Sequence, residues 1–410
     1  MARLLLSMAQ TLQGIENKMN VGADHIVLKL VTKKNRIEDV RIASNRTTMA
    51  ARILEGKSPQ EACAFVPLLF SLCGTAQHHA ALTAMEQALG YVPSPAHKTA
   101  RHLLLLAEGI AEHTTRLLID WAELGGQEKN INQIRDIRQT LASFKSLIFT
   151  ESGQDKIGGG TLAPDMTKLS SEFSRLRTII QSEIFKITPR EFADLPNRDA
   201  LENWISTTDS LPARCLKQWQ KDGLSDIIWP LAQGLMDFPP EEIAMHMDAE
   251  NADQFITYPT WDGRPCQTGA LMRHLSHPFL RQANHNALSY FYAKLIDLAV
   301  MIEDFEKNIS GLKQDDDLYH TKATYKGYAQ IEAVRGQLSH RVWINPQNDT
   351  IARYRILAPT EWNFHPNGIL KQALIGVESA DENKLKQIAQ INVLALDPCV
   401  ACRVDIEEQN

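Results

Sequence analysis

Two cysteines near the end of the chain have the spacing of a pair of metal ligands. Cys399 and Cys402 lie in the segment DPCVAC, residues 397–402. Two thiolates three positions apart can reach one metal ion when the backbone turns between them, and Pro398 stiffens that turn. Sulfur ligands suit nickel, zinc, low-spin iron or Cu(I). The pair therefore predicts a site for a soft metal ion, although two thiols without a metal have the same spacing.

The position of this pair argues against two common uses of a CxxC motif. A structural zinc site needs four ligands, and the sequence contains no second CxxC. A thioredoxin-type redox pair opens a helix after a strand early in a βαβ unit, whereas this pair comes almost at the end of the chain. Both functions are therefore disfavoured.

Cys73 is another candidate ligand, in the segment SLCGTAQHH at residues 71–79. The segment lies in an apolar helical region, and a lone cysteine beside glycine is more often a small core residue than a ligand. His78 and His79 can act as ligands, but they can equally lie at the surface or at a helix end. The sequence leaves these alternatives open.

Arg335 is a candidate for binding an anion. It precedes Gly336 in the segment EAVRGQLSH at residues 332–340, ahead of a predicted pair of strands. The arginine can simply belong to a surface turn. Its functional interpretation is a planar group with five N–H donors, presented to an anion beside open backbone N–H groups.

Taken together and in order, these segments resemble the conserved elements of [NiFe]-hydrogenase large subunits. The resemblance runs from about residue 25 to 402 and is weakest over 127–250. Ala270 stands where the central "GP-x-AR" element of the family has proline. The matching segments are 52–62 with Phe65, Val66, Cys73 and Gly74, the helix with Arg101, Glu112 and His113, 263–265 with 269–273, 332–340, 358–364 and 397–402.

The resemblance implies an incomplete metal site. In that family four cysteines hold nickel, and the second cysteine of each pair also bridges to an iron that carries two cyanides and one carbon monoxide. Cys73, Cys399 and Cys402 match three of these ligands, whereas the fourth, a bridging position, is Ala76. Ala80 stands where a histidine should follow. A stable nickel–iron site is therefore not expected.

The resemblance also implies that the groups facing the iron are retained. Arg335 would donate hydrogen bonds to one cyanide, and Thr360, with the backbone after Pro359, would serve the other. A chain that keeps these groups but lacks a bridging thiolate is similar to hydrogenase accessory proteins of the HupK/HoxV type. We therefore expect a non-catalytic scaffold that holds Fe(CN)2(CO) transiently, without nickel. The implied partners are a hydrogenase large-subunit precursor and small maturation chaperones.

Two other functions are compatible with the same residues. In an atypical hydrogenase, His78 or His79 would replace the missing thiolate, but imidazole is a poorer bridging ligand. The chain can also be a metal-free structural paralogue, as the related quinone-binding subunit of respiratory complex I is. Retention of Cys399 and Cys402 argues against that alternative.

The two ends of the chain differ from the family pattern. Asp405 replaces the histidine after which a protease trims hydrogenase precursors, and only five residues follow it. We therefore predict that no C-terminal processing occurs. The N-terminal glutamate that transfers protons in the family has no clear match, since Glu16 is a poor candidate.

The composition is that of an ordinary globular protein in the cytoplasm. The chain has 410 residues, 44% of them hydrophobic and 22% charged. The net charge of −6 argues against nucleic acid as a partner. A run of eighteen apolar residues is absent, so no membrane span is predicted. The start of the chain lacks a signal-peptide cleavage site, and six cysteines do not make a disulfide framework.

The elements that must position these residues are mainly helical. We predict one hydrogenase-large-subunit-like unit over 1–410, an α+β fold with small β elements. Inside the N-terminal core, Ser58 and Pro59 mark a helix start. The predicted parts are a β-hairpin over 25–43, an N-terminal helical core with Cys73 over 47–125, a divergent helical region over 127–250, and a C-terminal core over 251–410 that contains Arg335, Cys399 and Cys402, with a long helix over 286–310 and two strands within 342–357.

Overall fold

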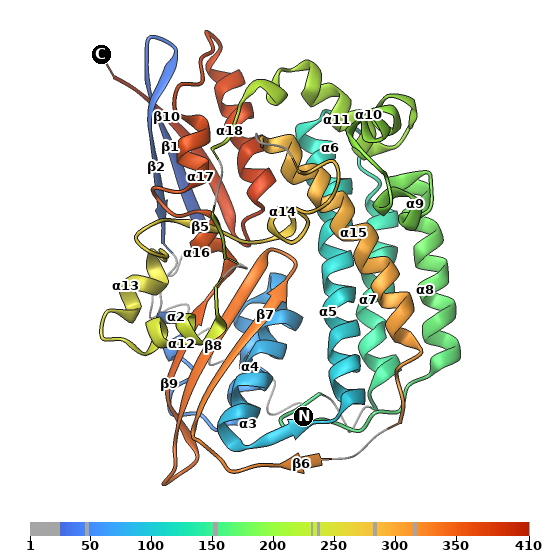
Figure 1. The fold of residues 1–410 in the computed structure, drawn as a ribbon, viewed down its shortest axis with the longest axis vertical. Helices are drawn as coiled ribbons and strands as arrows, with labels where there is room; N and C mark the ends of the chain where they lie inside the picture. The colour runs from blue at the N-terminus through green and yellow to red at the C-terminus, as the bar shows by residue number, and fades with distance from the viewer. Residues whose placement is uncertain are drawn as a thin grey trace.

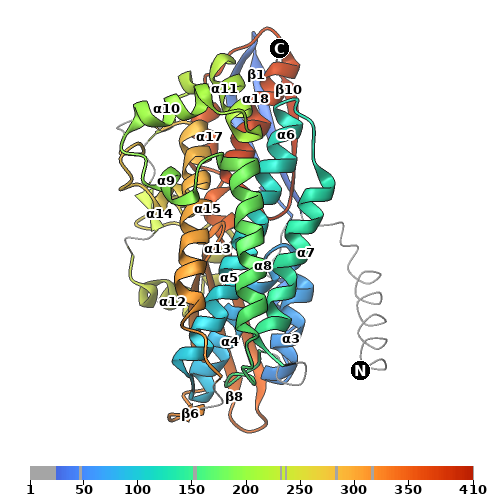
Figure 2. The same ribbon diagram turned by 90° about the vertical axis from the view of Figure 1, so that its right-hand side faces the viewer.

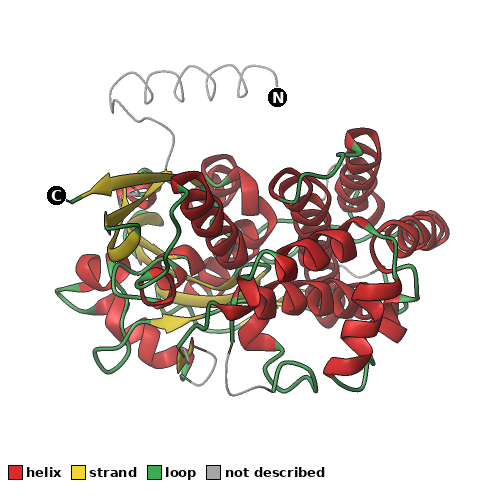
Figure 3. Ribbon diagram, turned by 90° about the horizontal axis from the view of Figure 1, so that it is seen from above, coloured by secondary structure: helices red, strands yellow, loops and turns green. Residues whose placement is uncertain are grey.

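Long helices and small β-sheets occupy opposite sides of the molecule (Figure 1). The computed structural model describes residues 25–45, 49–150, 155–230, 233–235, 238–281, 285–314 and 318–409. Seen from above, most of the strands lie together on one side and helices make up the rest (Figure 3). This arrangement confirms the predicted mainly helical α+β fold with small β elements. None of the described helices is long and apolar enough to cross a membrane.

The helical side is built around one central helix, α15 (Ala287–Ile309). Its bounds agree with the helix predicted over 286–310. Buried residues cover every side of its first three turns, which is typical of a helix in the middle of a core. Helices α5 (Pro95–Thr115), α7 (Ile131–Ile148) and α8 (Met166–Ile180) lie alongside it (Figure 2).

The predicted N-terminal hairpin is present and has a third strand. Strands β1 (His25–Lys33) and β2 (Arg36–Ser44) pair in antiparallel fashion. Strand β10 (Ala401–Glu408) adds to the other edge of β1, parallel to it, and pairs Cys402 with Ile26. The sequence did not predict β10. Its pairing joins the last residues of the chain to the first strand.

A second sheet carries the predicted strands near residue 350. Strands β7 (Lys326–Ala333), β8 (Gly336–Asn345) and β9 (Thr350–Leu357) form an antiparallel meander, of which β7 was not predicted. The sheet packs on helix α4 (Gly74–Leu89). At Gly327 a Cβ atom would lie 1.7 Å from a backbone oxygen of that helix, so only glycine permits this close approach.

The helix that leads to Cys73 begins as predicted. Ser58 and Glu61 form a capping box at the start of α3 (Pro59–Leu69). The Ser58 hydroxyl accepts a hydrogen bond from the Glu61 N–H at 3.3 Å, and the Glu61 carboxylate accepts one from the Ser58 N–H at 3.0 Å. A short turn of helix, η1 (Ser71–Cys73), then connects α3 to α4 and places Cys73 at the N-terminus of α4.

The region 127–250 is mostly helical, as predicted, and packs on the central helix. The Trp219 ring lies 5.3 Å from that of Trp121 and 4.8 Å from that of Phe291, between centroids. The remaining elements are α2 (Met49–Arg52), α6 (Trp121–Leu124), α9 (Pro189–Ala193), α10 (Arg198–Thr207), α11 (Leu211–Lys221), α12 (Pro240–Asp248), α13 (Ala252–Thr257), α14 (Ala270–Arg273), α16 (Pro359–Asn363), α17 (Ile369–Leu374), α18 (Glu382–Leu396), η2 (Arg116–Asp120), η3 (Gln181–Phe185), η4 (Leu224–Asp226), β3 (Tyr91–Pro93), β4 (Gln233–Gly234), β5 (Cys266–Gln267) and β6 (Leu318–His320).

Candidate metal-binding site

The C-terminal cysteine pair follows a sharp change of backbone direction. Helix α18 ends at Leu396, and Asp397 takes the left-handed conformation, with φ 55° and ψ 71°. Pro398 and Cys399 follow in a loop, and Cys402 lies on strand β10. A non-glycine residue in this conformation requires support from its surroundings. The support comes from the Asp397 side chain.

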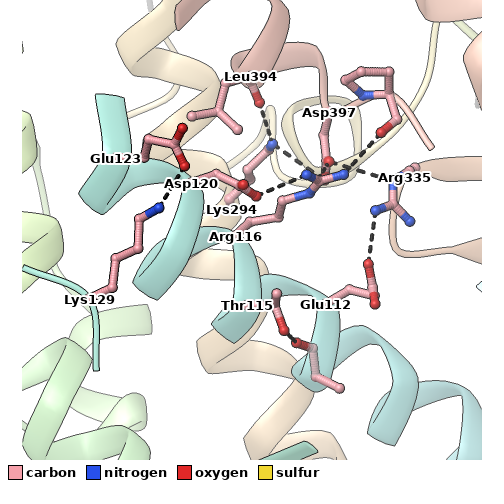
Figure 4. A network of polar contacts seen from close by, with 12 residues as sticks. Glu112, Thr115, Arg116, Asp120, Glu123, Lys129, Lys294, Arg335, Leu394 and Asp397 are labelled. Carbon is pink, nitrogen blue, oxygen red and sulfur yellow. Dashed lines mark hydrogen bonds and ion pairs between the residues drawn. The ribbon is translucent and has the colours of Figure 1, made fainter. Parts of the chain in front are cut away.

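Three buried or half-buried cations surround the carboxylate of Asp397 (Figure 4). Arg116 Nε lies 2.8 Å from it, and Lys294 Nζ and Arg335 Nε each lie 3.5 Å away. Arg116 also donates a hydrogen bond to the backbone oxygen of Pro398 at 3.0 Å. The segment η2 (Arg116–Asp120), helix α15 and the turn between β7 and β8 therefore all hold the loop that carries Cys399.

Burial and neighbouring charges shift the pKa values of Asp397 and Lys294 in opposite directions. Burial raises the pKa of Asp397, but Lys294, Arg335 and Arg116 outweigh it and hold that pKa well below its usual range. Burial lowers the pKa of Lys294 to about 8, against the raising effect of Asp397. The carboxylate is therefore charged at neutral pH, and it fixes the loop through ion pairs that water does not reach.

Arg335 lies in the turn between β7 and β8 and is almost fully buried. Its Nη2 donates to the Glu112 carboxylate at 2.9 Å. Its Nε and Nη1 are buried and donate no hydrogen bond within the described part of the chain, since the contact with Asp397 lacks hydrogen-bond geometry. Buried donors almost always have an acceptor. Two N–H groups of Arg335 are thus available to an anionic group.

The turn that carries Arg335 is fixed by contacts between the separate motif segments. Gly336 has φ 124°, and a Cβ atom there would lie 2.4 Å from the Thr268 side chain. Asn363 accepts a hydrogen bond from the Thr268 N–H at 3.1 Å and donates one to the Arg335 carbonyl at 3.4 Å. Arg273 donates to the backbone oxygen of Val334 at 2.9 Å. Segments far apart in the sequence therefore meet at Arg335.

Thr360 and Cys399 lie in contact. The Thr360 hydroxyl oxygen is 3.1 Å from the Cys399 sulfur. Thr360 follows Pro359 at the start of α16, and both residues are buried. A cavity of about 80 Å³ adjoins Thr360 and is lined by mostly apolar side chains, Ile26 of β1 among them. Thr360 therefore contacts Cys399 and also lines this cavity.

The sulfur of Cys73 lies close enough to that of Cys399 for the two to influence each other. Burial, with smaller contributions from Cys399 and Glu108, raises the pKa of Cys73 to about 12, against the lowering effects of Arg335 and Gln77. Glu108 lies behind Cys73, where its carboxylate accepts hydrogen bonds from the N–H groups of Thr75 at 2.6 Å and Ala76 at 3.0 Å. The Cys73 thiol is therefore protonated at neutral pH.

The structure thus brings together Cys73, Cys399, Thr360 and Arg335. Cys402 is attached to this group through the chain, on β10, where it packs against the main core and burial raises its pKa to about 11. Among the described residues, no three His, Cys, Asp or Glu side chains are already arranged around a common metal position. The predicted ligand set of Cys73, Cys399 and Cys402 therefore stays a prediction.

Comparisons with known proteins agree with this architecture. Residues 273–405, which include Arg335, Cys399 and Cys402, match the family model of the nickel-dependent hydrogenases. The reduced, active [NiFeSe] hydrogenase of Desulfomicrobium baculatum has the same fold, with a TM-score of 0.66 at 17% identity over 90% of this chain and 95% of that chain. The enzyme of Desulfovibrio vulgaris Hildenborough gives a TM-score of 0.63 at 16% identity over 90% and 94%. The chain therefore has the fold of the [NiFe]-hydrogenase large subunits, and its C-terminal third matches their family model.

Several relatives that are similar over most of the chain are named as hydrogenase expression/formation proteins. The hydrogenase expression/formation protein HoxV of Cupriavidus necator is 26% identical over 90% of this chain and 93% of that protein. HupK of Rhizobium leguminosarum is 25% identical over 95% of this chain and 98% of that protein. HupV of Azotobacter chroococcum is 28% identical over 87% of this chain and 90% of that protein. Both carry the same expression/formation description.

The two positions at which the chain departs from the metal-binding pattern of the [NiFe]-hydrogenase large subunits lie in one apolar pocket. Ala76 and Ala80 are completely buried and pack with Ala333, Leu338 and Ala358. At the two positions where the resemblance predicts a bridging cysteine and a histidine, the structure therefore has small, buried apolar side chains.

The two neighbouring histidines differ in their surroundings. The ring nitrogens of His78 lie 3.0 Å from the Cys63 carbonyl oxygen and 3.2 Å from that of Asp155, so both are engaged in the interior. Burial lowers the pKa of His79 to about 4, which keeps it neutral, and its Nδ1 is buried without a described partner. The atypical-hydrogenase alternative, as it concerns His78, therefore loses its ligand.

Several residues of the site were not identified from the sequence. Glu112 entered only through the resemblance, and Asp397 only as part of a motif. Arg116, Lys294 and Gln77 were overlooked. Lys294 carried a usable signal, because it lies with Asp297 in the mostly apolar first half of α15, and buried charges are almost always paired. For Arg116, the first residue of η2, the sequence alone contained no comparable signal.

Proposed function

We propose that this protein takes part in hydrogenase maturation as a non-catalytic scaffold for the Fe(CN)2(CO) unit. Cys399 and Cys402 supply the iron ligands, with Cys73 as a third thiol, and the unit passes from here to a hydrogenase large-subunit precursor. The observation that carries the proposal is the pair of buried N–H groups on Arg335 that have no described acceptor and lie beside Cys399. The expression/formation relatives support it.

The cations around the loop suit an anionic iron unit. Fe(II) with two cyanides and two thiolates has a net charge of −2. Arg116, Lys294 and Arg335 converge on the carboxylate of Asp397, two residues before Cys399. Arg116 also pairs with Asp120 and Arg335 with Glu112, so the attraction rests on the placement of these cations and on the buried Arg335 nitrogens that donate no described hydrogen bond.

Each retained residue has a separate task in this proposal. Arg335 donates charge-assisted hydrogen bonds to one cyanide nitrogen, and Thr360, with the backbone after Pro359, serves the other. Ala76 prevents the second bridging bond on which a stable nickel–iron centre depends. Iron is therefore held without nickel. Partners in this role are the client precursor and small maturation chaperones in the cytoplasm.

An infrared spectrum of the anaerobically purified full-length protein tests the proposal. The expected result is one CO and two CN stretches, in a spectral region where protein does not absorb, together with iron and little nickel by elemental analysis. Protein isolated from cells that assemble the iron unit but lacking these bands would contradict the scaffold function.

The metal-free structural paralogue remains the second candidate. It is favoured by the absence, among described residues, of three ligands already arranged around one metal position. A variant carrying both Cys399→Ala and Cys402→Ala distinguishes the candidates. Full hydrogenase activity in cells that contain only this variant would support the structural function and exclude the iron scaffold.

A further inference from the structure

A chain of three buried polar side chains ends on the sulfur of Cys73. Gln77, one turn further along α4, places its Nε2 3.7 Å from the Cys73 sulfur. Its Oε1 lies 2.9 Å from Nε2 of His340, and His340 Nδ1 lies 2.7 Å from the hydroxyl of Tyr354. Gln77, His340 and Tyr354 are each at most 1% exposed. Neither the ligand set nor the cyanide-facing set includes them.

The protonation states of His340 and Tyr354 allow hydrogen bonds to be donated in one direction, from Tyr354 through His340 and Gln77 to Cys73. Burial lowers the pKa of His340 to about 3, so the ring is neutral and carries one N–H. Burial raises the pKa of Tyr354 well above its usual value, so the hydroxyl keeps its proton. When Tyr354 donates to Nδ1 of His340, the ring proton lies on Nε2 and is donated to the Gln77 carbonyl. The Gln77 amide N–H then points at Cys73.

We propose that Gln77, oriented by His340 and Tyr354, is a positioning residue that holds Cys73 as a third sulfur ligand of the iron unit. This inference rests on the proposed function. A neutral thiol is a weak acceptor, whereas a metal-bound thiolate accepts a charge-assisted hydrogen bond. The N–H···S bond therefore strengthens when Cys73 binds iron, and it favours the bound state over the free one.

A purely structural Cys73 would not need this arrangement. A buried cysteine packs as a small apolar residue and requires no donor. Burying an amide, an imidazole and a phenol costs desolvation energy that apolar side chains at the same positions would avoid. Ala76, the residue before Gln77, provides only a methyl group. Gln77 thus supplies a polar side-chain contact to the Cys73 sulfur.

The test compares full-length variants purified anaerobically from cells that make the iron unit. The variants are Gln77→Leu, Cys73→Ser and their combination, and the readouts are the CO and CN stretching frequencies and the rate of iron loss to a chelator. Gln87→Leu is the matched control, because Gln87 lies on the same helix and accepts a hydrogen bond from the Tyr328 N–H. Melting temperatures verify that each variant is folded.

The expected result is specific to a donor on the sulfur. Without the hydrogen bond, the Cys73 thiolate donates more electron density to iron, so Gln77→Leu should lower the CO frequency. Iron loss should be about tenfold faster, the effect of one charge-assisted hydrogen bond. The combined variant should behave as Cys73→Ser alone, because Gln77 acts through Cys73. Gln87→Leu should match the unaltered protein.

Three results overturn the inference in distinguishable ways. If Cys73→Ser leaves both the frequencies and iron retention unchanged, Cys73 is not a ligand, while the scaffold function of Cys399 and Cys402 stands. If the unaltered protein has no CO and CN bands, the proposed function fails and this inference fails with it. If Gln77→Leu does not fold, Tyr354→Phe is used instead, because it preserves the packing and removes only the hydroxyl that hydrogen-bonds to His340. Unchanged CO and CN bands in that variant count against the inference.

Discussion

Replacing Arg335 by leucine tests directly whether this site recognises an anionic iron unit. The substitution removes the hydrogen bond to Glu112 at 2.9 Å, the ion pair with Asp397 at 3.5 Å and two buried N–H groups. The metal ligands are left unchanged. Any loss of cargo therefore reports on the groups around the iron.

The structure separates the effect on folding from the effect on cargo. Glu112 keeps an ion pair with Arg138 at 3.2 Å, and Asp397 keeps Arg116 and Lys294. Neither carboxylate is left alone, so the cost of about 3–5 kcal/mol for an unpaired buried charge is not expected. We expect a decrease of about 1.5–3 kcal/mol in the free energy of unfolding, the value of a hydrogen bond to a charged group.

The same free energy of about 1.5–3 kcal/mol should be lost from the binding of the iron unit. Losing one charge-assisted hydrogen bond to a cyanide corresponds to about ten- to a hundredfold weaker retention of iron. The CN stretches should shift and persist, because the iron–sulfur bonds remain. Iron retention is measured by dialysis against a chelator under anaerobic conditions, and the frequencies by infrared spectroscopy.

Arg138→Leu is the matched control for this experiment. It removes the other partner of Glu112, but Arg138 is 45% exposed and belongs to the rim of the site. Its loss should change neither the frequencies nor iron retention. A folded Arg335→Leu protein with unshifted CN bands and full iron content would show that Arg335 does not face the cyanides, and the argument from its free donors would be wrong.

The other substitutions and the intact mass address separate parts of the site. Cys402→Ala and Cys399→Ala each delete a metal–sulfur bond, so either should abolish the infrared bands and hydrogenase maturation, and unchanged bands would remove that residue from the ligand set. Asp405 lies on β10 opposite Lys29, within a paired strand, so intact mass from a strain that contains the hydrogenase protease should equal the full-length value, and a species ending near Asp405 would contradict this. The Asp397 carboxyl has a lower pKa in the folded protein than in the unfolded chain. Its ionised form therefore stabilises the folded protein above about pH 4, and this stabilisation is lost as the pH falls further. Asp397→Asn should lower the urea midpoint at pH 7 and lose less between pH 7 and pH 3 than the unaltered protein does, and an equal loss in both would refute that assignment.

Local signals in the sequence determined much of the fold. The capping box at Ser58, the alternation of the β1–β2 hairpin and the apolar stripe of α15 each depend on residues within a few positions of one another, and the structure confirms all three. Motif order was also visible in the sequence. It led to the [NiFe]-hydrogenase large subunits, because conserved spacing survives even where individual ligands such as the residue at Ala76 have changed.

Long-range pairing was decided only by the tertiary structure. Strand β10 has an alternating pattern, in which Cys402, Val404 and Ile406 pack against the core, but the pattern does not show which strand it joins. Only the tertiary structure places it beside the edge of β1, which offers unpaired backbone groups. The three cations around Asp397 come from η2, α15 and a hairpin turn, and no local pattern shows that they converge. The same holds for the path from Tyr354 through His340 and Gln77 to Cys73. Residue types specify which groups are able to hold an anion or a sulfur ligand, but the distances that make them do so arise only when separate segments pack into one core.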